Sequence, residues 1–450
     1  MQFSELNLTK PLIQALDDLG YTEPTTIQEQ VFGPIMAGKD VVGIAQTGTG
    51  KTMAYLLPII RLWKFSPKKT PDTIIIVPTR ELVVQVCEEF EKLAKYTSIK
   101  IAGAYGGTNI KTQMAEIASG VDVVVATSGR IVDLILNRTI PASQIKRVVI
   151  DEVDELLKLG FRAEITQLIE LIPTRRQTLM FSATMNAEID TLAMLTTHSP
   201  MRIETSTSGK PVEQIQHFYY EVKNAHTKIN LIRHLLKTDS SMKKVLIFGG
   251  GKRISDLVHA ELSFDFPDEI AVIHGNKNQN TRLKTLDEFE SGECRVLIAT
   301  DLLARGIDVT NITHVIHVDV PEIPESYIHR SGRTGRAGQS GKSIVLCSEA
   351  EKEGLTQIME ATSISILPLD FPSGVEVSDI LLPDETHKKG MKIIQVKKKI
   401  VPEKGAAFHE KKDKNKKVPI KLTREDKQRL RLGKLFGTKH GGLGKGKKKK

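Results

Sequence analysis

Short apolar runs recur along the chain, and each ends in glycine, hydroxyl or charged residues before a stretch with helical spacing. Between about residues 40 and 205 the runs are VVGIAQTG, TIIIVPTR, DVVVATSG, RVVIDEVD and TLMFSAT. The series restarts after residue 240 with KKVLIFGG, EIAVIHG, CRVLIATD, HVIHVDV and KSIVLCS. Continuous runs of this length are typical of strands that helices cover on both faces. The pattern therefore predicts an α/β fold with two tandem parallel-sheet domains.

The segment ETSTSGKPVEQ separates the two series and has the Ser, Thr, Gly and Pro content that is typical of a flexible linker. We expect a first domain at 1–205, a linker at 206–214, a second domain at 215–372 and a tail at 373–450. Open parallel sheets bind ligands beyond the carboxyl ends of their strands. Both domains are therefore expected to work at the edge where the glycines, hydroxyls and charges gather.

Composition narrows the class of protein. The chain has 450 residues, of which 40% are hydrophobic and 26% charged, which indicates a folded globular protein rather than a disordered or fibrous one. No apolar run approaches the roughly 18 residues of a membrane span, and the start lacks a signal-peptide pattern, so we expect a cytoplasmic location. The three cysteines are scattered, which argues against a disulfide framework or a zinc site.

The stretch AQTGTGKT lies between a strand-like run and the helical MAYLLPIIRLW. It matches a phosphate loop except that Ala45 replaces the first glycine. Gly48 and Gly50 would let backbone N–H groups close around phosphate oxygens, while Lys51 would reach the β and γ phosphates and Thr52 would hold Mg²⁺. The alternative is a chance glycine turn before a helix, which this placement between strand and helix disfavours.

Three carboxylates follow the apolar run in VVIDEVDELL. Acidic residues in the first turn of a helix are often explained by the helix dipole alone. Beside a phosphate loop, carboxylates can also bind Mg²⁺ and activate water. Asp151 would hold Mg²⁺ through its water shell, and Glu152 would orient and deprotonate the attacking water.

With these motifs in place, the chain resembles the DEAD-box ATP-dependent RNA helicases over residues 3–338. The motifs that carry the resemblance, in the family's order, are Gln28 in YTEPTTIQ, AQTGTGKT, PTREL, GG at 106–107, DEVD, SAT at 182–184, ARGID at 304–308 and HRSGRTGR at 329–336. The short N-terminus and basic tail are most similar to bacterial members of the RhlE type. The resemblance implies two RecA-like domains, RNA-stimulated ATP hydrolysis, and local, non-processive unwinding of short RNA duplexes or remodelling of RNA–protein complexes.

The resemblance also assigns the ATP site, with Mg²⁺ as cofactor. The ATP-binding positions it implies are Phe3, Tyr21, Gln28, Ala45, Gln46, Thr47, Gly48, Thr49, Gly50, Lys51, Thr52 and Asp308. Gln28 would meet the adenine edge, Phe3 or Tyr21 would pack on the base, and Asp308 would meet the ribose. Lys51 and Glu152 would be the catalytic residues of the first domain. Arg333 and Arg336 would reach across as arginine fingers, a contribution of roughly 10³–10⁵ in rate.

Two further sets follow from the same resemblance. Asp154, Ser182 and Thr184 would couple the ATP site to the RNA side through hydroxyl–carboxylate bonds. The positions that match RNA-backbone contacts are Arg80, Gly107, Thr127, Arg130, Gln279, Arg282 and Thr300. Such groups hold phosphates and sugars without reading sequence. Taken singly, each is more often a solvated or capping residue.

Three positions depart from the family pattern. Val153 replaces alanine in the acidic motif, where we expect a change in packing rather than in catalysis. Ser128 replaces the proline of TPGR, and IFGGGKR lacks the polar residue that many relatives have after IF. Both departures put RNA contacts there in doubt.

The net charge of +10 belongs to the C-terminal region. Residues 385–450 hold 24 Lys and Arg against 6 Asp and Glu, whereas residues 1–384 hold 40 against 48. So few apolar residues predict that most of the tail is disordered. A solvated cationic tail is one interpretation. We favour a tether for RNA phosphates, whose affinity falls steeply with salt.

Two other functions use the same parts. An ATP-gated RNA clamp would hold RNA without unwinding it, and a P-loop kinase for a small metabolite would leave the second domain and its arginines unexplained. The expected partners are ATP and RNA, with ribosomal or RNA-decay assemblies as candidates. We expect a monomer that does not bind a membrane.

Overall fold

The computed structural model describes residues 2–46, 48–65, 70–205, 214–301, 309, 311–335 and 339–386. The chain divides into two units, Met1–Lys389 and Gly390–Lys450. Several predicted features lie outside the described residues: Thr47, the linker before Gln214, the ARGID segment with Asp308, Arg336, and the tail beyond Thr386.

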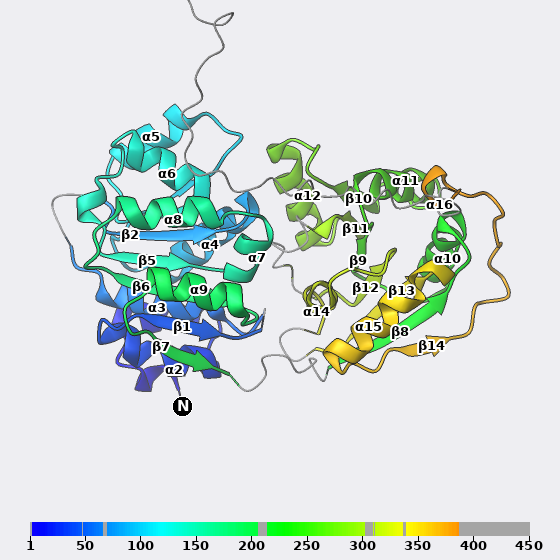
Figure 1. Cartoon of the computed structure of the whole chain (residues 1–450), viewed down its shortest axis with the longest axis horizontal. Helices are drawn as coiled ribbons and strands as arrows, with labels where there is room; N and C mark the ends of the chain where they lie inside the picture. The colour runs from blue at the N-terminus through cyan, green and yellow to red at the C-terminus, as the bar shows by residue number, and fades with distance from the viewer. Residues whose placement is uncertain are drawn as a thin grey trace, which may run out of the picture. The chain divides into compact units, whose positions relative to one another are not determined.

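The first domain is built on a sheet of seven parallel strands in the order β3-β4-β2-β5-β6-β1-β7 (Figure 1). The strands are β1 (Val41–Ile44), β2 (Thr73–Val77), β3 (Ile101–Ala104), β4 (Val123–Thr127), β5 (Arg147–Ile150), β6 (Gln177–Ser182) and β7 (Met201–Glu204). Every residue of β1, β2 and β6 is buried. The continuous apolar runs therefore reflect burial on both faces.

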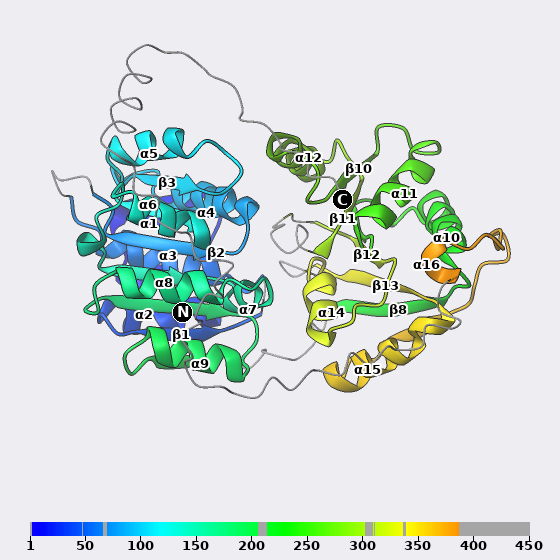
Figure 2. The same cartoon turned by 45° about the horizontal axis from the view of Figure 1, so that its top comes forward.

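Helices cover both faces of this sheet (Figures 1 and 2). They are α1 (Lys10–Asp18), α2 (Thr26–Met36), α3 (Lys51–Leu62), α4 (Arg80–Leu93), α5 (Ile110–Ala118), α6 (Ser128–Leu136), α7 (Val153–Lys158), α8 (Arg162–Leu171) and α9 (Ala187–Thr196). Short 3-10 turns are η1 (Phe3–Glu5) and η2 (Ala142–Gln144). Helices α1 to α4 contribute to one apolar cluster, and α5 to α9 contribute to a second.

The second domain repeats the plan with the strand order β10-β11-β9-β12-β13-β8-β14, again all parallel. Its strands are β8 (Ile215–Glu221), β9 (Val245–Phe248), β10 (Ile270–Ile273), β11 (Val296–Ala299), β12 (His314–His317), β13 (Gly341–Cys347) and β14 (Leu367–Leu369). Its helices are α10 (Ala225–Thr238), α11 (Lys252–Ser263), α12 (Gln279–Ser291), α14 (Pro324–Ser331), α15 (Lys352–Thr362) and α16 (Pro383–Thr386), with the 3-10 turn η3 (Glu349–Glu351). The prediction of two parallel-sheet domains is confirmed.

The first residues of the region that we predicted as tail contact α10. The Asn224 side chain donates to the Ser378 carbonyl at 2.6 Å, and the Ala225 amide donates to Glu385 Oε1 at 2.8 Å. The Glu385 carboxylate thus accepts from the first amide of α10, where a negative charge is favourable. The packed part of the second domain continues past residue 373 as far as α16.

Within the described ranges, no helix is both long enough and apolar enough to cross a lipid bilayer.

A buried polar network connects α14 with strands β8, β12 and β13 of the second domain. His217 Nδ1 and the Tyr327 hydroxyl are 2.7 Å apart, and His317 Nε2 is 2.9 Å from the Ser343 hydroxyl. Burial lowers the pKa of His217 to about 4. The imidazole is therefore neutral in the folded domain at neutral pH and serves as a hydrogen-bonding group.

We expect the stability of the second domain to fall in mild acid. The unfolded His217 takes up a proton near its ordinary pKa of 6.5, whereas the folded one resists until about pH 4. The free energy of unfolding should therefore drop as pH falls through this window, by at most about 1.4 kcal/mol per pH unit from this group. Urea unfolding at pH 7.5 and pH 5 measures the drop, and His217→Gln should reduce it. An unchanged pH dependence in the variant would contradict this role.

Candidate active site and nucleic-acid interface

The phosphate loop connects β1 to α3. Gly48 has φ 82° and Gly50 has φ 85°, a left-handed conformation that glycine adopts without strain. Gly50 is the N-cap of α3, which begins at Lys51. The loop thus ends at a helix N-terminus, whose free amides favour a bound anion.

Gln28 holds this loop from α2. Its Oε1 accepts the Thr25 amide at 3.0 Å, and its Nε2 donates to the Gly50 carbonyl at 3.1 Å. A Cβ at Gly50 would lie 2.3 Å from Nε2, so glycine is needed for this approach. Of the two rings predicted to pack on a base, Phe3 is 4% exposed in the core and Tyr21 is 47% exposed. Only the Tyr21 ring is therefore at the surface.

Lys51 is 5% exposed, and its Nζ lies 3.2 Å from Glu152 Oε1. Burial alone would lower the pKa of Lys51, but the carboxylates of Glu152 and Asp151 outweigh it and raise the pKa. The ammonium is therefore charged and paired. An incoming triphosphate would compete with Glu152 for it.

Asp151 follows β5 and accepts one hydrogen bond on each oxygen. The Glu152 amide donates to Oδ1 at 2.8 Å, and the Tyr55 hydroxyl donates to Oδ2 at 2.9 Å. Burial, followed by the neighbouring Glu152, raises the pKa of Asp151 to about 6, and Lys51 and Tyr55 oppose this rise. Glu152 itself has φ 49° and ψ 53°, which is uncommon for a residue with a side chain and costs roughly 1–3 kcal/mol.

The donor set beside the loop suits Mg²⁺. Asp151 offers carboxylate oxygens that keep free lone pairs, and Thr52 offers a hydroxyl from the first turn of α3. Oxygen ligands of this kind, completed by water and phosphate, are those that Mg²⁺ prefers.

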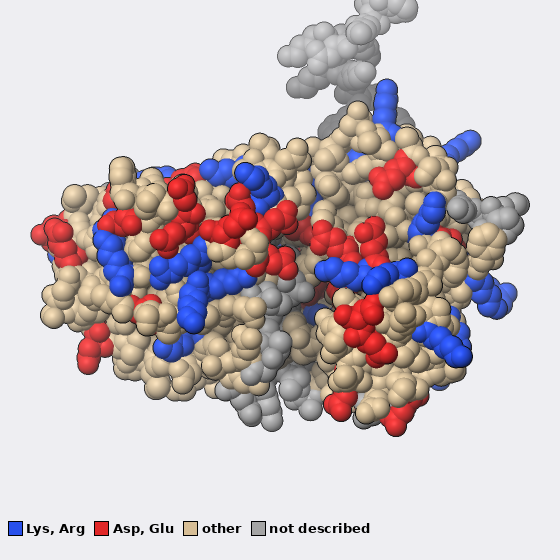
Figure 3. Space-filling model, turned by 180° about the vertical axis from the view of Figure 1, so that it is seen from behind, with Lys and Arg blue, Asp and Glu red and all other residues tan. Residues whose placement is uncertain are grey.

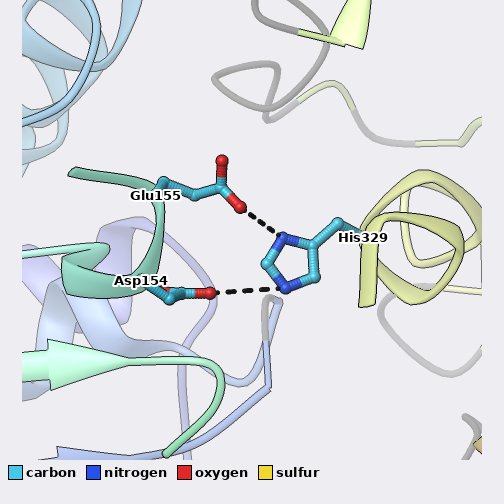
Figure 4. Close-up of side chains that lie close together, drawn as sticks. All are labelled: Asp154, Glu155 and His329. Atoms are coloured by element: carbon cyan, nitrogen blue, oxygen red, sulfur yellow. Dashed lines mark ion pairs between the residues drawn. The ribbon is translucent and has the colours of Figure 1, made fainter. Parts of the chain in front are cut away.

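Asp154 joins the two domains at α7 and α14 (Figure 4). Its Oδ1 accepts the Ser182 hydroxyl at 2.9 Å, and its Oδ2 lies 3.5 Å from His329 Nε2. His329 Nδ1 lies 3.0 Å from Glu155 Oε1 on the other side of the ring. Thr184 follows two residues after Ser182 and is partly buried. The ring of one domain is thus bracketed by two carboxylates of the other.

The C-terminal end of α14 is fixed by a different arginine from those predicted as fingers. Arg330 pairs with Asp301 at 2.5 Å and Asp319 at 3.1 Å, and its guanidinium lies 5.1 Å from the centre of the Phe248 ring. Arg333 is 5% exposed, and its Nε donates to the His329 carbonyl at 3.2 Å. The described geometry therefore places Arg333 beside His329.

Three of the first-domain residues predicted for RNA, Arg80, Thr127 and Arg130, line a cavity of about 520 Å³. Ser128 and the second-domain residue Arg282 line it as well. Arg130 donates to Gln113 Oε1 at 2.5 Å. A Cβ at Gly107 would lie 2.2 Å from a nitrogen of the Arg80 guanidinium, and Gly107 has φ 82°. Glycine at 107 therefore lets this arginine lie across the loop.

Two predicted RNA contacts of the second domain are held by a carboxylate of the first. Gln279 Nε2 donates to Glu81 Oε1 at 3.1 Å, and Arg282 forms an ion pair with the same oxygen. Burial lowers the pKa of Arg282, and Glu81 opposes this. Glu81 belongs to the PTREL motif, but its pairing across domains could not be read from that motif. Thr300, directly after β11, is partly exposed.

The three departures from the family pattern have structural explanations. Val153 is the first residue of α7 and is fully buried in the apolar cluster to which α5 to α9 contribute, so it acts in packing. Ser128 is the first residue of α6, where a proline is also tolerated because the first helical amide needs no partner. Gly249 is the residue directly after IF, and a Cβ there would lie 2.3 Å from Ser255 Oγ and 3.0 Å from Ser255 Cα. The close approach of α11 at Ser255 therefore leaves no room for a larger side chain at this position.

The face drawn in Figure 3 carries Lys and Arg side chains interspersed with Asp and Glu side chains. It is not a uniformly basic platform, which agrees with the slight acidic excess of residues 1–384.

Two parallel sheets, a phosphate loop after β1 and an acidic motif after β5 define a P-loop ATPase with two RecA-like domains. Residues 25–192 match the DEAD/DEAH box helicase family, and residues 227–338 match the helicase conserved C-terminal domain. The chain is 35% identical to the ATP-dependent RNA helicase DbpA of Bacillus subtilis over 376 residues. This alignment covers 84% of this chain and 78% of DbpA. The chain belongs to the DEAD-box ATP-dependent RNA helicase family.

Other relatives place the same segment in longer proteins. The DEAD-box ATP-dependent RNA helicase 28 of Oryza sativa subsp. japonica is 39% identical over 317 residues, which is 69% of this chain and 39% of the rice protein. The structure of S. cerevisiae Dbp5 bound to RNA and ADP BeF3 superposes with a TM-score of 0.75 at 26% identity, over 82% of this chain and 95% of Dbp5. The narrower likeness to the RhlE type stays a prediction.

Replacing Glu152 with glutamine tests the general base. The amide keeps the size of the side chain but cannot accept a proton, so we expect ATP turnover to fall about 10²–10⁴-fold. Nucleotide binding should be retained, as measured with a fluorescent ATP analogue. Glu188→Gln on the exposed face of α9 is the control and should keep full turnover. Full turnover by Glu152→Gln would rule out this base.

Proposed function

We propose that this chain is an RNA-stimulated ATPase that separates short RNA duplexes locally. The observation that best supports the proposal is the bracketing of His329 by Asp154 and Glu155. It ties the acidic motif of the ATP site to the helix that precedes the predicted arginine fingers. Hydrolysis would therefore depend on both domains being in contact.

Each residue near the loop has a part in the proposed reaction. Lys51 exchanges Glu152 for the β and γ phosphates, which frees the Glu152 carboxylate to accept a proton from the attacking water. Asp151 and Thr52 would hold Mg²⁺, which would supply positive charge to neutralise the phosphates. Arg333, together with Arg336, stabilises the charge of the transition state from the second domain.

The proposed RNA path follows the cavity that Arg80, Thr127 and Arg130 line. Arginines and hydroxyls there would hold phosphates and sugars, so binding would not depend on base sequence. Binding of RNA would also compete with Glu81 for Arg282. A cytoplasmic monomer that acts in ribosomal or RNA-decay assemblies completes the proposal.

A glycine pair gives a matched test of this path. Gly107→Ala would force the Arg80 guanidinium aside, so we expect RNA affinity and RNA stimulation of ATP turnover to fall at least about tenfold. Gly38 has φ 75° with nothing within 4 Å of an added Cβ, so Gly38→Ala imposes similar backbone strain without displacing an arginine. ATP turnover with and without RNA is the measurement. Equal loss in both variants would point to strain rather than to Arg80.

Strand displacement separates unwinding from clamping. With a short duplex and ATP, the proposed helicase releases the displaced strand faster than a nonhydrolysable analogue allows. A protein that retains RNA with the analogue but releases no strand is an ATP-gated clamp. A lack of RNA stimulation in the unmodified protein would overturn the proposal itself.

The tail gives a separate prediction. Residues 390–450 contain 22 Lys and Arg against 5 Asp and Glu, and a deletion that starts at 390 preserves the Glu385 contact with α10. If the tail tethers RNA, its removal should lower RNA affinity and flatten the slope of log affinity against log salt. Fluorescence anisotropy with labelled RNA between 50 and roughly 200 mM salt measures both. An unchanged slope would exclude the tether.

A further inference from the structure

Tyr55 lies on α3, one turn after the phosphate-loop lysine, and is completely buried. Its ring packs against Phe181 of β6 at 5.4 Å between ring centres. Its hydroxyl is the one polar group of this side chain, and it points to the end of β5. There it donates to Asp151 Oδ2 at 2.9 Å.

Packing alone does not explain why residue 55 is tyrosine rather than phenylalanine. A phenylalanine would fill the same space against Phe181 without a polar atom to remove from water. The hydroxyl instead bonds the Asp151 carboxylate, which is one of the groups proposed to hold Mg²⁺. A phenol is protonated at neutral pH, so it serves as the donor in this bond.

The two bonds to Asp151 fix the plane of its carboxylate. One comes from the Glu152 amide, which moves only with the backbone, and the other comes from Tyr55. Without the phenol, Oδ2 would be a buried oxygen with no donor, and the side chain would be free to rotate about its terminal bond. A carboxylate that is free to rotate is a poorly oriented metal ligand, and poor orientation weakens metal binding.

We propose that Tyr55 is a positioning residue that orients Asp151 for the Mg²⁺ of Mg·ATP. This inference rests on the proposed function, because that function requires Mg·ATP. Tyr55 does not touch substrate. Its effect should therefore appear in the magnesium dependence of nucleotide binding rather than in the chemical step.

The test uses the full chain with Tyr55→Phe, which keeps the ring and removes only the hydroxyl. Binding of a fluorescent nonhydrolysable ATP analogue is titrated at increasing Mg²⁺ without RNA. We expect the half-saturating Mg²⁺ concentration to rise roughly ten- to a hundredfold, since the lost bond goes to a charged group. Binding of the analogue in EDTA should stay unchanged. Tyr220→Phe, which alters another buried tyrosine in the second domain, should leave both measurements unchanged.

A double-mutant cycle with Asp151→Asn shows whether Tyr55 acts through Asp151. If it does, Tyr55→Phe adds little further loss in the Asp151→Asn background, whereas independent effects would add. Thermal unfolding and the EDTA measurement check that the variant is folded. If Tyr55→Phe binds the analogue in EDTA and keeps the wild-type Mg²⁺ dependence, the inference is wrong and the proposed function stands. If the unmodified protein shows no Mg²⁺ dependence, the proposed function fails with it.

Discussion

Buried charge at the carboxyl end of β5 is the constraint on which the rest of the site depends. Lys51, Asp151 and Asp154 are each no more than 5% exposed. A buried ion is costly unless it is paired and hydrogen-bonded. The neighbours described above supply these interactions. Glu152 forms an ion pair with Lys51, the Tyr55 phenol and the Glu152 amide donate to Asp151, and the Ser182 hydroxyl donates to Asp154.

The same demand joins the two domains. Asp154 and Glu155 each present a carboxylate oxygen to His329, and Glu81 presents one to Gln279 and Arg282. Each of these contacts buries a charged or polar group of one domain against its complement in the other. The contact surface between the domains is therefore polar and specific. A ligand that binds one of these side chains would compete with its contact across the domains. Polar interfaces of this kind are typical of domains that can move relative to one another.

The fold could be predicted closely because a strand that is buried on both faces appears in the sequence as a continuous apolar run. Each of the ten apolar runs forms a strand, and the strands are parallel as expected. The phosphate loop and acidic motif could also be placed, since each follows a strand directly. The cross-domain role of Glu81 and the phenol of Tyr55 could not. Both depend on side-chain rotamers and on contacts between residues about 100 or more positions apart, for which spacing along the chain carries no signal.

The two bonds of Gln28 have a consequence for nucleotide choice. A primary amide has two hydrogens and two acceptor lone pairs, and the contacts with Gly50 and Thr25 use one of each. One donor and one acceptor are left over, which is the complement of the adenine edge that carries N6 and N7. A base with the opposite pattern would have to pull the amide away from Gly50 to be satisfied. The predicted contact of Gln28 with adenine would therefore use the same side chain that bonds the phosphate loop at Gly50.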